Sequence, residues 1–161
     1  MKEKVEAMRL RTVDPGPDRE ANLPMLLLAD ESEQQVRSYL QKGILYVASQ
    51  DGEDVGVVQA IPFLLSSVKL RAVAVIPEKR QRGLGREMLR RVLSDLNGRG
   101  YSRVTVGTGN SSIAQIAFYQ KSGFRMWRIE QDYFSPEKGY PEGLEENGIP
   151  LRDMLWFERT S

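Results

Sequence analysis

The feature that most constrains the fold is a short glycine- and arginine-rich turn at residues 80–85, Arg-Gln-Arg-Gly-Leu-Gly. It separates an apolar stretch at 68–76, typical of a strand, from an amphipathic stretch at 86–96, typical of a helix. Such a helix start presents N–H groups without an internal partner at the positive end of the helix dipole. Because glycine lets the backbone approach an anion closely, the turn predicts a pyrophosphate site.

Two familiar phosphate-binding patterns do not fit this turn. A dinucleotide fingerprint needs a third glycine where this chain has Met88, and a phosphate-binding loop of the Walker type needs Gly-Lys-Ser/Thr after the turn. Taken alone, the turn is equally consistent with a tight strand-to-helix connection whose arginines are simply solvated. The residues around it must therefore decide between these interpretations.

The rest of the 161-residue chain indicates one domain with a mixed sheet flanked by helices. Hairpin-type strands come first, and strand–helix alternation follows. Residues 135–150 are rich in proline, glycine and glutamate and are expected to form a long loop. Strands are expected at residues 8–13, 44–49, 55–61, 68–76, 103–107, 124–130 and 155–157, and helices at 21–29, 33–41, 86–96 and 112–122.

Composition excludes several kinds of chemistry. The chain has no cysteine and no histidine, which rules out thiol nucleophiles, Ser/His/Asp triads and most zinc sites. A net charge of +1 disfavours a nucleic-acid or membrane-surface role for the whole domain. No apolar run approaches the length of a membrane span, and the first residues do not resemble a signal peptide, so we expect a cytoplasmic protein.

A second block of residues changes the interpretation of the turn. The pattern Arg80-x-x-Gly83-x-Gly85 follows Pro77-Glu78, and residues 110–124 carry Asn-Ser-Ser-Ile-Ala-Gln-Ile-Ala-Phe-Tyr-Gln-Lys-Ser-Gly-Phe. Together they resemble the acetyl-CoA pyrophosphate loop and the closing helix of the GNAT superfamily of N-acetyltransferases. The resemblance spans residues 8 to 129. With Glu146-Asn147-Gly148 added, the chain looks closest to an uncharacterised bacterial branch of that superfamily.

The resemblance implies an α/β (α+β) fold with a central mixed, mostly antiparallel sheet of about six to seven strands and about four flanking helices. The strands at 68–76 and 103–107 would form a parallel, splayed pair. Pantetheine of acetyl-CoA, the acyl-donor cosubstrate, would lie between them, with the pyrophosphate on the backbone amides of the turn and no metal. The cofactor-binding residues implied are Val73, Val75, Arg80, Gln81, Arg82, Gly83, Leu84, Gly85, Arg86, Asn110 and Ser112, of which Arg80 and Arg82 would reach phosphates through their side chains.

Tyr119 lies where many members of the superfamily carry the general acid for the departing CoA thiolate. A phenol is a plausible proton source for that group, although a tyrosine merely packed beside the sulfur would leave the same pattern. The usual asparagine of the motif falls on Ser112, a good helix N-cap residue, and Asn110 lies two positions earlier. The sequence leaves open which of the two touches the cofactor.

The general base is open as well. Members of the superfamily often place a glutamate on the strand before the turn, but this chain has Lys69, Leu70 and Arg71 there. Segments 21–41 and 135–150 are expected to wall the acceptor site, and an acidic wall would favour a cationic amine. The candidate carboxylates are Glu31, Glu33, Asp132, Glu145 and Glu146, whereas Glu78 and Glu142 fit exposed positions.

The residues and the resemblance together predict an acyltransferase that moves acetyl from acetyl-CoA to a primary amine of a small molecule or peptide, by direct attack through a tetrahedral intermediate. The alternative is a CoA-binding regulatory domain without transferase activity, which the missing strand carboxylate favours. A nucleic-acid binder would need a more basic chain. The apolar last strand makes a homodimer a reasonable assembly, and the whole chain would form a single acyl-CoA N-acyltransferase domain.

Overall fold

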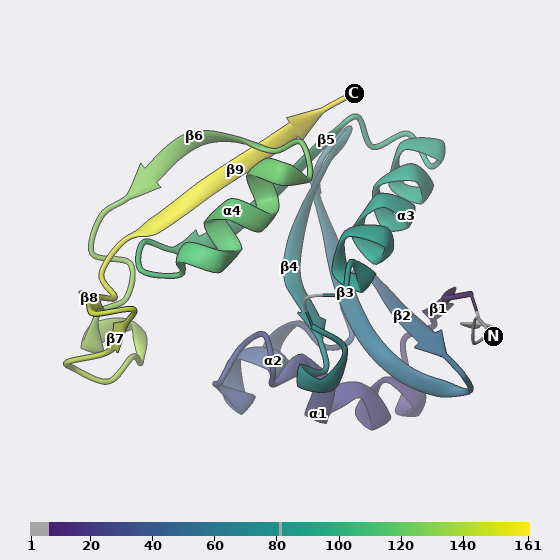
Figure 1. The fold of residues 1–161 in the computed structure, drawn as a ribbon, viewed down its shortest axis with the longest axis horizontal. Helices are drawn as coiled ribbons and strands as arrows, with labels where there is room; N and C mark the ends of the chain where they lie inside the picture. The colour runs from purple at the N-terminus through teal and green to yellow at the C-terminus, as the bar shows by residue number, and fades with distance from the viewer. Residues whose placement is uncertain (1–6, 81) are drawn as a thin grey trace, which may run out of the picture. The chain divides into compact units, whose positions relative to one another are not determined.

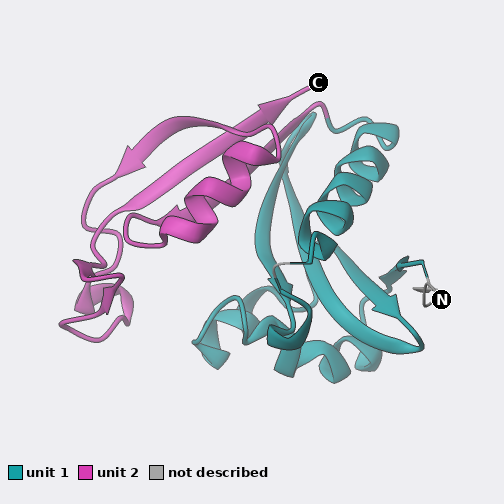
Figure 2. Cartoon of the chain, viewed as in Figure 1, with its two compact units in different colours: residues 1–101 teal, residues 102–161 magenta. Residues whose placement is uncertain are grey.

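The computed structural model describes residues 7–80 and 82–161, which include every helix and strand named below (Figure 1). The chain divides into two compact units, residues up to 101 and residues from 102 (Figure 2). The first unit holds β1 (Arg9–Val13), α1 (Leu23–Leu26), α2 (Glu33–Tyr39), β2 (Ile44–Gln50), β3 (Glu53–Leu64), β4 (Ser67–Val75) and α3 (Leu84–Gly98). The second unit holds β5 (Arg103–Gly109), α4 (Ile113–Lys121), β6 (Arg125–Glu130), β7 (Glu145–Glu146), β8 (Ile149–Pro150) and β9 (Met154–Thr160).

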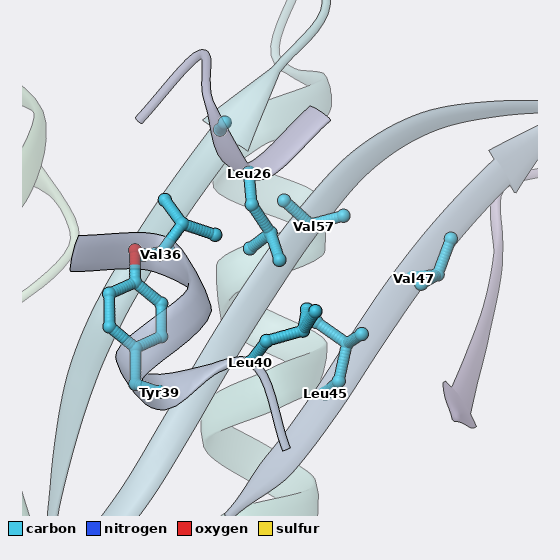
Figure 3. Close-up of a cluster of buried hydrophobic side chains, with 9 residues drawn as sticks. Leu26, Val36, Tyr39, Leu40, Leu45, Val47 and Val57 are labelled. Carbon is cyan, nitrogen blue, oxygen red and sulfur yellow. The ribbon is translucent and has the colours of Figure 1, made fainter. Parts of the chain in front are cut away.

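Strands β1 to β4 of the first unit form an antiparallel meander in chain order. Strands β2 and β3 are buried without a break over residues 45–48 and 55–60, whereas positions of β4 alternate between buried and partly exposed, as a strand with one face on a core requires. Helices α1 and α2 cover that face, and Figure 3 shows their side chains meeting those of the strands. The resulting core contains Leu26, Val36, Tyr39, Leu40, Leu45, Val47, Val57, Ala72 and Ala74.

The corner between α2 and β2 is held by a buried cation. Arg19 is 1% exposed, and its guanidinium donates hydrogen bonds to the carbonyl oxygens of Val13, Leu40, Lys42 and Gly43. Burial lowers the pKa of Arg19, although a nearby Asp14 acts in the opposite direction. Four carbonyl acceptors replace the hydration that this cation loses, so the corner is fixed without a buried carboxylate.

Helix α3 lies against β3 of the same unit through one apolar stripe, as its sequence pattern predicts. Gly56 on β3 allows this close approach, because a Cβ there would lie 2.7 Å from the Met88 sulfur. Farther along the helix, the Tyr46 hydroxyl donates a hydrogen bond to Asp95, which also accepts one from Arg99 at 2.7 Å. These contacts fix the position of α3 on the sheet.

The sheet of the second unit has β9 between β5 and β6, and both pairings are antiparallel. The rings of Tyr119, Phe124 and Phe157 meet in its core, where α4 packs. The apolar character of β9, which suggested a dimer in the sequence, is therefore explained by burial inside this sheet. Met154, Trp156 and Phe157 are all buried there.

Two segments differ from the sequence prediction. The helix expected at 21–29 is a 3-10 helix, Pro17–Asn22, followed by the four-residue α1. Pro24 explains this, since it has no N–H to continue a helix from the preceding turn. The expected loop at 135–150 contains a 3-10 turn, Pro136–Lys138, and the hairpin of β7 and β8. Its two-residue turn, Asn147-Gly148, has positive φ at both positions, as a type I′ turn requires.

The remaining expected strands and helices are present, with boundaries shifted by a few residues. Within residues 7–80 and 82–161, we find no helix that is both long enough and apolar enough to cross a membrane.

Candidate functional site

The end of β4 presents the two strand residues that the sequence singled out. Val73 and Val75 are half-buried, whereas Ala72 and Ala74, the residues that precede each of them, point into the core. The predicted alternation is therefore present. After β4, Ile76 donates its N–H to the Val55 carbonyl oxygen on β3. The chain leaves the sheet through the 3-10 turn Pro77–Lys79.

Gly83 is the N-cap residue of α3 and has a φ of 76°. This left-handed conformation favours glycine, and no heavy atom beyond the neighbouring residues lies within 4 Å of where a Cβ would be. The Gly83 carbonyl accepts from the Glu87 N–H, which is the first intrahelical bond. The amides of Leu84, Gly85 and Arg86 in the first turn therefore have no acceptor within the helix.

Arginine side chains surround this helix start. Arg82 and Arg86 are exposed, and neither forms an ion pair or hydrogen bond with another described residue. Arg80 instead donates from Nε to the Val75 carbonyl oxygen at 2.9 Å. The predicted contact of Gln81 lies outside the described residues.

The one carboxylate in the first turn of α3 is neutralised within the helix. Glu87 accepts hydrogen bonds from Arg90 and Arg91, and these bonds lower the pKa of Glu87 to about 2. Free amides, the helix dipole and two unpaired guanidinium groups thus remain at the helix start. A diphosphate fits this set of donors without displacing any existing interaction of Arg82 or Arg86.

Tyr119 is 4% exposed in the second unit, with its ring against those of Phe118, Phe124 and Phe157. Burial raises the pKa of the Tyr119 hydroxyl well above its ordinary value. No other described residue hydrogen-bonds this hydroxyl. The phenol therefore keeps its proton at physiological pH.

Asn110 acts as a clamp at the end of β5. Its Nδ2 donates to the Pro150 carbonyl oxygen at 3.0 Å, and its Oδ1 accepts from the backbone N–H groups of Arg152 and Asp153. A Cβ at the neighbouring Gly109 would lie 2.4 Å from a methyl carbon of Leu151, so the Leu151 side chain would have to move to admit one. The side chain of Asn110 is thus fully used in joining two segments of the second unit.

Ser112 is the N-cap residue of α4, as expected, but its hydroxyl does not cap the helix. The Oγ donates to the Glu146 carboxylate at 2.8 Å, and Asn147 donates to the Ser111 carbonyl oxygen. Sequence reasoning did not foresee these contacts between the hairpin and the helix start. The Ser111 hydroxyl is fully buried and has no hydrogen-bond partner among the described residues.

The carboxylates considered as the general base differ in their exposure and in their hydrogen-bond and ion-pair partners. Glu31 and Glu78 are exposed, and Glu33 is paired with Arg37 on α2. Of the candidates in the second unit, Glu146 is held by Ser112 and Glu145 is exposed on β7.

Asp132 belongs to a pocket formed entirely by the second unit, with a volume of about 320 Å³. Phe134 and Leu151 contribute apolar surface to it, and Asp132, Glu142 and Arg152 contribute charge. Segment 135–150, which the sequence assigns to the acceptor site, supplies much of this pocket. No other described residue pairs with the carboxylates of Asp132 and Glu142.

Comparisons with known proteins point in one direction. Residues 41–126 match the family model described as an acetyltransferase (GNAT) domain. The chain is 36% identical to the uncharacterized N-acetyltransferase YvbK of Bacillus subtilis over 131 residues, which are 81% of this chain and 83% of that protein.

Solved structures agree with this match. An IAA acetyltransferase from Bacillus cereus is 37% identical, with a TM-score of 0.86 over 96% of this chain and 100% of that one. A Bacillus subtilis acetyltransferase in complex with CoA is 32% identical, with a TM-score of 0.87 over 96% and 99%. A GNAT family acetyltransferase from Elizabethkingia anophelis with acetyl-CoA bound is 30% identical, with a TM-score of 0.84 over 96% and 98%. The fold class that the sequence predicts is confirmed by these matches.

Proposed function

Because this chain belongs to the GNAT superfamily of acetyltransferases, we propose that it transfers the acetyl group of acetyl-CoA to a primary amine. The observation that carries the proposal is the start of α3, where Gly83 sets the turn and Arg82 and Arg86 have no partner among the described residues. CoA and acetyl-CoA in the related solved structures support this cosubstrate.

In the proposed reaction, the neutral amine attacks the thioester carbonyl directly. A carbon–nitrogen bond forms, a tetrahedral intermediate collapses, and the carbon–sulfur bond breaks. Tyr119 donates its proton to the departing sulfur, which leaves as a thiol, and the amine proton passes to water or a carboxylate. No enzyme nucleophile is required, in keeping with the absence of cysteine and histidine.

We assign the diphosphate to the first amides of α3 and to Arg82 and Arg86. Arg80 is the weaker candidate for a side-chain contact, since its Nε already donates to Val75. Val73 and Val75 are proposed to present their backbone to the pantetheine. Ser112 is favoured over Asn110 for any cofactor contact, because the Asn110 side-chain oxygen already accepts two hydrogen bonds, whereas the Ser112 hydroxyl, which donates to Glu146, can still accept one.

The acceptor is proposed to be a cationic amine, small molecule or peptide. Residues 130–153 contain seven carboxylates and only two cationic side chains, so this part of the chain attracts positive charge. The pocket with Asp132 and Glu142 lies within it. The two unpaired carboxylates favour an ammonium group there, and Phe134 favours an attached apolar segment.

Binding and turnover should be measured separately. Calorimetric titration of acetyl-CoA should show at least tenfold weaker binding for the double variant Arg82→Ala/Arg86→Ala, because charge-assisted hydrogen bonds are each worth about 1.5–3 kcal/mol. Arg90→Ala is the matched control, since Arg90 is exposed on the same helix but paired with Glu87. Equal binding by all three proteins would remove the assignment of the diphosphate.

A thiol-release assay with acetyl-CoA and a panel of amines tests the transfer itself. We expect turnover with polyamines or other dicationic amines and little with anionic ones. Tight binding of acetyl-CoA without turnover on any amine of the panel would instead favour a regulatory CoA-binding domain.

A further inference from the structure

The pocket of the second unit is lined by side chains of both charge signs. Besides Asp132 and Glu142, Arg152 lines it. The Arg152 guanidinium forms no ion pair or hydrogen bond with another described residue. Residues 130–153, all of which the structure describes, contain one further cationic side chain, Lys138, and this one is paired with Glu130 at 3.4 Å. Arg152 is therefore the cation of this segment that remains available to a ligand.

The opposite charges in this pocket do not neutralise one another. Neither Asp132 nor Glu142 forms an ion pair with Arg152, or with any other residue among those described. An ionised carboxylate accepts hydrogen bonds from an ammonium group, and a guanidinium can hold a carboxylate through two parallel N–H···O bonds. The pocket therefore complements a ligand that carries two positive charges and one negative charge.

The backbone that carries Asp132 and Arg152 is fixed by hydrogen bonds. Asp132 has a φ of 56°, in the left-handed region, and its N–H donates to the Asp153 carboxylate at 2.9 Å. The Arg152 N–H donates to Asn110 Oδ1 at 2.8 Å, and the Arg152 carbonyl oxygen accepts from the Phe134 N–H at 3.0 Å. A backbone that is already held in place loses little entropy when a ligand binds.

The rest of the pocket wall is mostly apolar and stiff. Pro136, Pro141 and Pro150 line it, and a proline ring fixes the backbone angle φ. Phe134 lines it as well, and its ring packs edge-on against that of Tyr140 with a centroid distance of 5.0 Å. The volume of about 320 Å³ lies at the lower end of the range of about 300–1,000 Å³ for small-molecule sites. These features favour a small ligand with a short methylene chain.

The pocket adjoins the segment that leads into α4. A Cβ at Gly109, the last residue of β5, would lie 2.4 Å from a methyl carbon of Leu151 and 3.5 Å from a ring carbon of Phe134. Both of these side chains line the pocket. Helix α4 begins a few residues after Gly109 and carries Tyr119, the proposed general acid. The pocket and the proposed acid therefore belong to adjoining segments of one unit, as an acceptor site requires.

We propose that the acceptor held in this pocket is a diamino acid, a small molecule with two ammonium groups and one carboxylate, as in lysine. Arg152 holds the carboxylate, and Asp132 and Glu142 attract the ammonium groups, while the methylene chain lies against Phe134. A diamine without a carboxylate leaves Arg152 unused, and a monoamino acid leaves one carboxylate of the pocket unused. This assignment rests on the proposed function, because it names the acceptor of the same reaction.

The transfer itself changes how well this ligand fits. One amino group gives up a proton to water or a carboxylate, forms the new carbon–nitrogen bond, and becomes a neutral amide as the thiol leaves. The product therefore carries one positive charge instead of two and loses its attraction to one of the two carboxylates. We expect N-acetyllysine to bind at least fivefold more weakly than lysine, which favours release of the product.

Calorimetric titration in the presence of CoA tests the binding without turnover, because CoA carries no acetyl group. Wild type should bind L-lysine at least tenfold more tightly than 1,5-diaminopentane, which is lysine without its carboxylate. Arg152→Ala should bind lysine at least tenfold more weakly than wild type does and the diamine no more weakly. Arg125→Ala is the matched control, since Arg125 is an exposed arginine of β6 without a partner among the described residues and does not line the pocket. It should bind both probes like wild type.

Thiol release with the same two amines separates this assignment from the proposed function. The kcat/KM of wild type should be at least tenfold higher for lysine, and that ratio should fall to about one in Arg152→Ala. Turnover of amines with a ratio near one in wild type, or an equal loss in Arg125→Ala and Arg152→Ala, would overturn the diamino acid and leave the transferase in place. Absence of thiol release with every amine would contradict the proposed function instead, and the titration would still decide the ligand of the pocket.

Discussion

Gly83 shows how a single backbone angle sets the start of α3, where we propose that the diphosphate binds. Its φ of 76° turns the chain so that α3 begins with free amides facing outward, and no side chain fills the space beside it. We expect Gly83→Ala to raise the KM for acetyl-CoA about tenfold and to lower the free energy of unfolding by about 1 kcal/mol, since a Cβ disfavours the left-handed region. Initial-rate kinetics and urea unfolding measure the two effects.

Gly52 provides the control for that prediction. It has the same φ of 76° and equally open surroundings, but it lies in the turn between β2 and β3. Gly52→Ala should lose similar stability and leave the KM unchanged. If both variants raised the KM equally, the effect would be one of general stability and the assignment of the turn would be wrong.

Two buried tyrosines allow a proposed catalytic hydroxyl, that of Tyr119, to be compared with a structural one, that of Tyr46. Tyr119→Phe removes a hydroxyl with no partner among the described residues, so we expect stability within about 0.5 kcal/mol of wild type and a kcat about 100-fold lower. Tyr46→Phe removes the hydrogen bond to Asp95 and should cost about 2 kcal/mol with an unchanged kcat. A normal kcat for Tyr119→Phe would exclude the general-acid role.

At the residue scale, the sequence predicts those structural features that depend on one short-range signal. The glycine at the helix start and the alternation of Val73 and Val75 follow from short-range rules. The contacts of Asn110 and Ser112 do not, because their partners lie more than thirty positions later in the chain. No local pattern identifies the residues that will meet across such a distance. The site assignments of both residues stay predictions.

At the scale of elements, the Asn110 side chain joins the segment that follows β8 to the end of β5, next to the backbone hydrogen bond from the Asn110 N–H to the Asp153 carbonyl oxygen. Asn110→Ala removes three hydrogen bonds and leaves two backbone N–H groups without their acceptor, so we expect a loss of about 2 kcal/mol in urea unfolding. Asn110→Asp keeps the acceptor and should lose less.

The exposed Gln115 on α4 serves as the control for the clamp. Gln115→Ala should leave the stability within about 0.5 kcal/mol of wild type. If Asn110→Ala were equally neutral when no acetyl-CoA is present, the clamp would not hold the segment.

Most elements could be predicted because their apolar periodicity agrees with their burial. The first helices could not, since the pattern at 21–29 is helical whereas Pro24 interrupts the hydrogen bonds. The hairpin of β7 and β8 was missed although Asn147-Gly148 is a turn signal, because strands of two residues show no alternation. The last strand extends beyond the predicted residues 155–157, because Glu158, Arg159 and Thr160 are polar and yet continue the pairing with β5.

For the whole molecule, the dependence of stability on pH follows from groups with shifted pKa values. Carboxylates set it at acidic pH and tyrosines set it at alkaline pH. Bonds from arginines lower the pKa of Glu87 to about 2, and hydrogen bonds from Tyr46 and Arg99 outweigh burial in lowering the pKa of Asp95. Such carboxylates contribute stability above their unfolded pKa of about 4, and that stability is lost as the pH falls below it.

The tyrosines affect stability at high pH instead of low pH. Burial raises the pKa of both Tyr46 and Tyr119, so the folded state resists their ionisation. Above about pH 10 the unfolded chain ionises first, and stability falls as the pH rises. With no histidine to titrate between, the urea midpoint should stay nearly flat from about pH 6 to 9 and decline on both sides. A sharp change near pH 6.5 would contradict this account.

The position of β9 has a consequence for how the chain is made. This strand is the middle of its sheet, yet it leaves the ribosome after β5 and β6, the two neighbours between which it lies. Until it emerges, β5 and β6 both expose the edges that it will occupy. Pairing then joins residues roughly 50 positions apart, which makes this a late and slow step of synthesis-coupled folding. The newborn chain is therefore most open to misassembly in its second unit, just before its last strand is added.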